Sequence, residues 1–166
     1  MLRITRDEFK QIYKDTSVLD YIDTFYSEPE NDKDLIDNYI ISKLWRLNNL
    51  YTIVDKFANV STFKMNKSQH RVYAASLRHP RLIILKSRQQ GISTFWLVNF
   101  FDEACVKSNM SIGLMAQGQD EAATLLTRVK FLWEQLPSAF KAYLNIKLQT
   151  DNTKALSMSN GSSIFV

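Results

Sequence analysis

Residues 81–94 have the sequence RLIILKSRQQGIST, and residues 93–106 continue as STFWLVNFFDEACV. The run 81–86 is short and apolar, as in a buried parallel strand. The run 93–106 is apolar on most sides, which predicts a buried helix. Between them lies a polar loop that carries Gly91, the first glycine of the chain. The order strand, loop, helix is the context in which phosphate-binding loops occur.

The loop departs from the usual phosphate-loop pattern, G-x-x-x-x-G-K-[ST]. With Gly91 as the second glycine, Ser93 takes the Ser/Thr position and Ile92 replaces the lysine. Lys86 then stands at the first glycine. Backbone N–H groups of the loop and of the first helical turn can still surround phosphate oxygens. On the pattern alone, a polar turn in which Ser93 or a neighbour caps the helix is an equal alternative.

Several side chains of residues 86–94 have a chemical use at a phosphate group. Gly91 permits a close backbone approach, and the hydroxyl of Ser93, with Thr94 as a substitute, can bind Mg²⁺. Lys86 supplies a compact positive charge. Arg88 supplies a forked donor for a γ-phosphate, the role of an arginine finger in cis.

Composition and charge limit the class of protein. The chain has 166 residues, 45% of them hydrophobic and 23% charged, an ordinary globular balance. One cysteine excludes a disulfide framework within the chain, and no stretch reaches the roughly 18 apolar residues of a membrane span. The start, MLRITRDEFK, has no signal-peptide core. These features predict a soluble, intracellular protein.

The positive charge of the chain is concentrated in one stretch. Residues 1–60 carry a net charge of −3 and residues 61–166 carry +7, which together give +4. Residues 61–90 contain seven Lys and Arg residues and no acid, a pattern that attracts phosphate. Outside the loop, two interpretations remain open, a solvated surface and contact with DNA phosphates. They concern Lys64, Lys67, Arg71 and Arg78.

Periodicity predicts the remaining elements. Helices are expected over residues 5–27 with a break near Ser17, 34–49, 66–77 and 120–136. Strands are expected at 51–55 and 60–63 as a hairpin, then at 111–117, 144–148, 155–158 and 162–166, with a turn at Asn160-Gly161. The alternation from residue 81 onward predicts an α/β fold with a parallel sheet. A helical segment, 1–49, would precede a domain formed by residues 50–166.

Five segments in this order resemble one family, the large subunit of tailed-bacteriophage terminase, the ATPase of the viral DNA-packaging motor. They are LWRLNNLYTIVDK (44–56), TFKMNKSQ (62–69), ILKSRQQGIST (84–94), SIGLMAQGQDEAATLLTRVKFLWEQLP (111–137) and LSMSNGSSIFV (156–166). K-x-R-Q-x-G-x-S is similar to that family's variant Walker A loop, in which the lysine is displaced. The resemblance implies a RecA-like P-loop NTPase core.

The resemblance also implies roles for individual residues. Gln69 would contact the adenine of ATP, Lys86 would neutralise phosphate charge, and Arg88 would sense the γ-phosphate. Ser93 would hold Mg²⁺ through its hydroxyl. The remaining ATP-binding positions, which contribute mainly backbone N–H groups or a supporting hydroxyl, are Ser87, Gln89, Gln90, Gly91, Ile92 and Thr94. The partners implied are double-stranded DNA, the portal, the small terminase subunit and further copies of the chain, in the cytoplasm of a bacterial host.

The chain departs from the family pattern at Walker B, an apolar strand that ends in adjacent acids. Asp120-Glu121 opens a helix, where acids favour the N-terminus, and Asp102-Glu103 lies within a buried helix pattern. We therefore expect the N-terminal part of a terminase, as from a truncated prophage gene or a split gene, that binds ATP weakly and hydrolyses it poorly. The alternatives are another helicase-like P-loop ATPase and a non-catalytic remnant that binds DNA or a partner. For His70 and His79, structural or surface roles are favoured over metal binding.

Overall fold

The computed structural model describes residues 4–55 and 57–166, and it shows an α/β protein. The chain forms two compact units, each built from two stretches of sequence. Unit 1 contains Met1–Asn49 and Lys64–Phe95, and unit 2 contains Leu50–Phe63 and Trp96–Val166. The chain first passes between the units after Asn49, where the helical segment was expected to end. The assignment of residues 50–166 to one ATPase domain stays a prediction.

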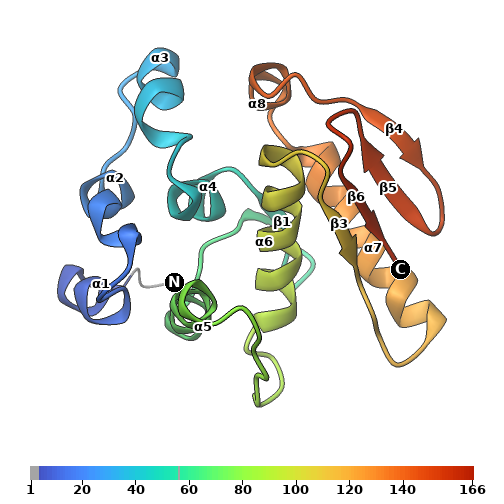
Figure 1. Cartoon of the computed structure of the whole chain (residues 1–166), viewed down its shortest axis with the longest axis horizontal. Coiled ribbons are helices and arrows are strands. Elements are labelled where there is room, and N and C mark those ends of the chain that lie inside the picture. The colour runs from blue at the N-terminus through green and yellow to red at the C-terminus, as the bar shows by residue number, and fades with distance from the viewer. Residues whose placement is uncertain (1–3, 56) are drawn as a thin grey trace. The chain divides into compact units, whose positions relative to one another are not determined.

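Unit 1 is helical (Figure 1). The predicted break near Ser17 is confirmed, but the continuous helix predicted over 34–49 is wrong, because the chain leaves helical geometry at residues 40–42. The elements are α1 (Arg6–Ile12), the 3₁₀ helix η1 (Ser17–Tyr21), α2 (Ile22–Tyr26), α3 (Asp32–Asp34), the π-helical turn η2 (Leu35–Tyr39), α4 (Lys43–Asn49), α5 (Lys67–Arg78) and the first turn of α6 (Ile92–Val106).

Local hydrogen bonds explain the interruption before α4. The hydroxyl of Ser42 accepts from the backbone N–H of Trp45 at 3.3 Å, so Ser42 acts as an N-cap and a new helix starts there. Arg46 Nη1 donates to the carbonyl of Ile40 at 2.5 Å. Apolar spacing alone does not reveal this restart, since the stripe continues across it.

The core of unit 1 is an aromatic cluster between α1, α2 and α5. Phe9 lies with its ring centroid 4.7 Å from that of Tyr13 and 5.1 Å from that of Phe25. The hydroxyl of Tyr13 and Nδ1 of His70 form a hydrogen bond at 2.6 Å, and both side chains are buried. Burial lowers the pKa of His70 to about 4 and raises that of Tyr13 well above 10. The structural role favoured for His70 is therefore confirmed.

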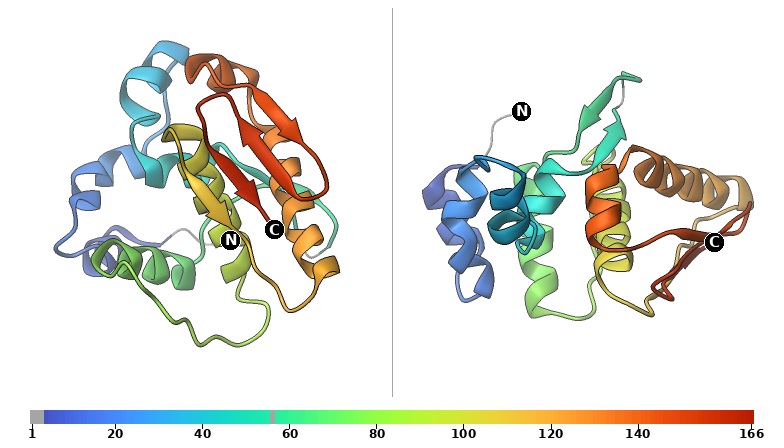
Figure 2. Two further views of the ribbon diagram at one scale, coloured as in Figure 1. Left: turned by 45° about the vertical axis from the view of Figure 1, so that its right-hand side comes forward. Right: turned by 90° about the horizontal axis from the view of Figure 1, so that it is seen from above.

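Unit 2 contains a hairpin and a four-stranded sheet with α7 along one face (Figures 1 and 2). The hairpin pairs β1 (Thr52–Val54) with β2 (Val60–Thr62), as predicted. The sheet has the order β3-β6-β5-β4, in which only β3 and β6 are parallel. The other elements are β3 (Ser111–Gly113), α7 (Gln119–Gln135), α8 (Ser138–Tyr143), β4 (Leu148–Asp151), β5 (Ala155–Met158) and β6 (Ser163–Phe165).

The turn between β5 and β6 joins the sheet to the end of α6. Asn160 Nδ2 donates to the carbonyls of Ala104 and Lys107 at 2.8 and 3.1 Å. Gly161 has φ +81°, and an added Cβ would lie 2.2 Å from Oδ1 of Asn109. This position therefore requires glycine, and the predicted turn at Asn160-Gly161 is confirmed.

The predictions of a strand at 81–86 and of a parallel sheet are wrong. Residues 82–87 have no regular structure, so the strand predicted at 81–86 does not form, and the trace between α5 and α6 carries no arrow in Figure 1. The sheet is mixed rather than parallel, because the C-terminal strands turn back as hairpins beside β3. An apolar run shows a preference for burial, but a strand also needs a neighbour for its N–H and C=O groups. No described strand pairs with residues 82–87.

Candidate phosphate-binding loop

The 86–94 loop, defined as residues 86–94 and including the first helical residues of α6, has an unusual backbone. Gln89 has φ +63° and Gly91 has φ +68°, both in the left-handed region. A Cβ on Gly91 would lie 2.8 Å from Nε2 of Gln69. Gly91 is therefore needed both for its dihedral angle and for the close approach of Gln69. Left-handed residues at short intervals are typical of loops that turn backbone N–H groups toward an anion.

Helix α5 holds the loop through its N-terminal cap. Asn66 Oδ1 accepts from the N–H of Gln69 at 3.0 Å, and Gln69 Oε1 accepts from the N–H of Asn66 at 2.8 Å. The same two side chains also reach the loop: Gln69 Nε2 donates to the carbonyl of Gly91 at 2.8 Å, and Asn66 Nδ2 donates to that of Gln90 at 3.2 Å. A reciprocal capping box thus positions the loop.

Gln69 lies next to the loop, but both polar atoms of its side-chain amide already form hydrogen bonds, Oε1 with Asn66 and Nε2 with Gly91. Gln69 is only 3% exposed. Contact with an adenine edge would require its side chain to exchange the bonds to Asn66 and Gly91 for bonds to the base. The sequence reasoning missed Asn66, although an Asn followed three residues later by Gln is a recognisable helix-start pattern.

The two cations of the loop lie at the surface. Lys86 and Arg88 are exposed, and neither forms a hydrogen bond or ion pair with any described residue. Ser87, Gln89 and Gln90 are also exposed, and Gln90 Nε2 donates to the Ser87 hydroxyl at 3.1 Å. The loop therefore displays two positive charges to solvent, and no acid of the described residues neutralises them.

Helix α6 starts at the end of this loop and adds backbone donors. The N–H of Phe95 donates to the carbonyl of Gly91 at 2.9 Å, which closes the first turn. Ile92 is buried and anchors the helix start, whereas Ser93 is exposed and Thr94 is half-buried. The first N–H groups of a helix lack intrahelical acceptors and lie at its positive end. The first turn of α6 contains no acid.

The carboxylates considered at Walker B have other positions. Asp102 is fully buried in α6 and accepts a hydrogen bond from the Tyr51 hydroxyl at 2.6 Å. Asp120 and Glu121 are exposed in the first turn of α7, as expected for acids that favour a helix start. No three His, Cys, Asp or Glu side chains in the described part of the chain come together as a metal site. Cation binding at the loop would therefore depend on the Ser93 hydroxyl together with phosphate oxygens.

Comparison with known proteins gives no family for this chain. It matches no protein-family model, and no curated protein matches it. None of the helices formed by residues 4–55 and 57–166 is long and apolar enough to cross a membrane. The functional proposal therefore rests on the geometry of the loop and on the sequence resemblance.

Proposed function

We propose that the 86–94 loop binds the phosphates of ATP, and that the chain is the ATP-binding part of a terminase-type DNA-packaging ATPase. The observation that carries the proposal is the pair of exposed cations, Lys86 and Arg88, without partners among the described residues, beside the acid-free start of α6. Two exposed cations beside the positive end of a helix attract a polyanion such as a triphosphate.

The residues present fit this ligand. Gly91 supplies the left-handed turn of the loop, and Lys86 and Arg88 supply charge. Ser93 is exposed at the helix start, where its hydroxyl can take one position around Mg²⁺. When bound, Mg²⁺ neutralises phosphate charge. Asn66 and Gln69 are positioning residues, because they hold the loop through its carbonyls.

We expect binding without efficient hydrolysis. The reaction also needs a residue that orients the attacking water. Of the two acid pairs considered at Walker B, Asp102 is bonded to Tyr51 and Asp120 lies in the first turn of α7. A RecA-like core would further require residues 81–86 to pair as a strand. Double-stranded DNA, the portal, the small terminase subunit and further copies of the chain are the partners that this proposal implies.

The test is Mg²⁺-dependent binding of a fluorescent ATP analogue. Lys86→Ala and Ser93→Ala should each weaken binding about tenfold or more, since a charge-assisted or metal-mediated contact is worth about 1.5–3 kcal/mol. Lys147→Ala and Ser108→Ala make the same changes at exposed positions outside the loop and should bind as the native chain does. Circular dichroism verifies folding. A folded native chain that does not bind, or loop variants that bind normally, would refute the proposal.

A further inference from the structure

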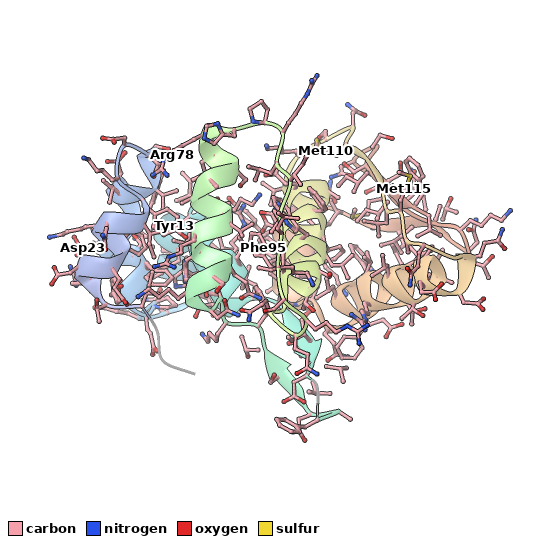
Figure 3. All side chains as sticks on the ribbon, turned by 90° about the horizontal axis from the view of Figure 1, so that it is seen from below. Tyr13, Asp23, Arg78, Phe95, Met110 and Met115 are labelled. Carbon is pink, nitrogen blue, oxygen red and sulfur yellow. The ribbon has the colours of Figure 1, made fainter. Side chains whose placement is uncertain are left out.

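Helices α1 and α5 border an open groove of about 260 Å³ in unit 1, referred to as the α1–α5 groove. Lys67, Arg71 and Arg78 line it from α5, while Glu8 and Ile12 line it from α1. Figure 3 shows Arg78 at the end of α5, on the side where α1 lies. The groove thus gathers three of the four cations whose interpretation the sequence left open.

These three cations form one row along α5. Arg71 follows Lys67 by four residues and Arg78 follows Arg71 by seven, so each step is close to a whole number of helical turns. At a rise of about 1.5 Å per residue, the Cα atoms of Lys67 and Arg78 lie about 16 Å apart. A single phosphate group cannot reach all three side chains. The row is suited to an extended polyanion.

Two of the cations are available for a ligand. Arg71 is exposed and forms no hydrogen bond or ion pair with any described residue. Arg78 is held at the groove, because its Nη2 donates to the carbonyls of Ile12 and Lys14 at 3.1 and 2.5 Å. The other N–H groups of Arg78 have no acceptor within the described residues. A guanidinium fixed in this way loses little further freedom when it binds an anion.

The remaining charges around the groove do not oppose an anion. Among the described residues, Glu8 is the one acid that lines it, and Lys67 pairs with this carboxylate. The pairing with Lys67 and the bonds to Thr5 lower the pKa of Glu8. The fourth cation, Lys64, plays no part here, since its Nζ donates to Oδ1 of Asn49 at 2.8 Å and the side chain is half-buried.

We propose that the α1–α5 groove binds the sugar–phosphate backbone of double-stranded DNA, with Arg71 and Arg78 on phosphates and no reading of base sequence. A nucleic acid carries a phosphate at every nucleotide, so it can meet a row of cations without any particular sequence. An acidic peptide would need carboxylates at matching intervals. Among the described residues that line the groove none is aromatic, so none can stack on a base. Contacts of this kind supply affinity and position without specificity.

The choice of double-stranded DNA over other nucleic acids rests on the proposed function, whereas the row of cations is an observation separate from the 86–94 loop. The test measures fluorescence anisotropy of a short labelled duplex of random sequence, at several salt concentrations. Arg71→Gln is the decisive variant, because Arg71 has no partner within the described residues whose loss would disturb the fold. Arg128→Gln is the matched control, since Arg128 is exposed on α7 and likewise has no partner there.

Arg71→Gln should weaken duplex binding about threefold to tenfold and reduce the slope of log K against log salt by about 0.9, the value for one phosphate contact. Arg128→Gln should leave both quantities unchanged. Equal binding by Arg71→Gln and the native chain would overturn the inference, as would an equal loss in Arg128→Gln or no duplex binding by the folded native chain. Displacement of the duplex by polyglutamate at equal charge would assign the groove to an acidic protein instead.

Binding of the ATP analogue separates this inference from the proposed function. Arg71→Gln should bind the analogue as the native chain does, because the groove is not part of the loop. A loss of both ligands in Arg71→Gln, with folding intact, would overturn the assignment of the groove as a separate site. If the native chain binds the duplex but not the analogue, the groove stands and the nucleotide proposal fails.

Discussion

Helix α5 and the 79–90 segment that follows it come from the same acid-free stretch of sequence, but they have opposite environments. The buried face of α5 includes His70 and Tyr73, and its first turn is closed by a capping box. In the 79–90 segment, Ile83 is 94% exposed and Leu85 is 95% exposed. A helix satisfies its own backbone groups and needs a neighbour only for one face, whereas an extended run needs a neighbour for its backbone as well. Positive charge and apolar content do not distinguish these two cases.

The contrast implies a division of roles between these neighbouring regions. Substitutions on the buried face of α5 should change the free energy of unfolding. Substitutions in the 79–90 segment should leave stability almost unchanged. Where they touch the 86–94 loop, they should change ligand binding instead. Three experiments test this division, beginning with the largest expected effect.

Acid should destabilise the α5 side of the protein through His70. Burial lowers the pKa of His70 to about 4 from an ordinary 6.5, so between these pH values the unfolded chain binds a proton that the folded chain does not. The contribution of neutral His70 is complete above about pH 6.5, decreases as the pH falls toward 4, and is lost below that. The total loss is on the order of 3 kcal/mol. Urea unfolding at a series of pH values measures it.

The two histidines provide the control for this pH dependence. His70→Gln is expected to be less stable at neutral pH, because it lacks the buried ring and its bond from Tyr13, but its stability should change less between pH 6.5 and 4. His79→Gln alters an exposed histidine and should retain the native profile. A native profile that is flat over this interval would show that His70 is accessible to protons in the folded chain.

Gly91 lies where the two regions meet. Gly91→Ala should lower the free energy of unfolding by about 1–2 kcal/mol, the penalty for a left-handed residue with a Cβ. The new Cβ would lie 2.8 Å from Nε2 of Gln69 and would therefore push the Gln69 amide away. The loop would then lose its hydrogen bond to α5 and bind the ATP analogue more weakly. Gln90→Ala, at a neighbouring exposed position, should have little effect on stability. Normal stability and normal analogue binding in Gly91→Ala would show that the loop tolerates another backbone conformation.

The sequence predicted the elements whose backbone N–H and C=O groups form hydrogen bonds within the element itself. The helices at 66–77, 93–106 and 120–136 and the β1–β2 hairpin are confirmed with shifts of a residue or two. The short helix α8 was missed, and β4 begins at Leu148, the last residue of the strand predicted at 144–148. The mixed sheet was not predictable, since strand order depends on which edges meet in three dimensions.

For the candidate site, sequence placed the loop and Gln69 together but not the manner of their contact. The resemblance suggested a base-reading role for Gln69, whereas the structure shows a cap and a tie to Gly91. The capping relation was available from Asn66 and Gln69 at a spacing of three. That Lys86 and Arg88 stand free of acids could not be read from their positions alone, because ion pairs form between residues distant in sequence.

The smallest effect on stability is expected in the exposed 79–90 segment. Leu85→Ala should change the free energy of unfolding by less than about 0.5 kcal/mol, because the side chain has almost no buried surface to lose. The same substitution at Leu44, which is buried in α4, should cost about 2–5 kcal/mol. Chemical denaturation measures both.

If Leu85→Ala lowered the free energy of unfolding by nearly as much as Leu44→Ala, the 79–90 segment would be packed in solution, as the apolar run RLIILK predicts. The segment would then need a strand neighbour, and its difference from the buried helices of unit 1 would disappear. A negligible cost would leave the segment free of stabilising contacts. Nucleotide-dependent protection of its amides from hydrogen exchange would then show whether ligand binding at the adjoining loop orders it.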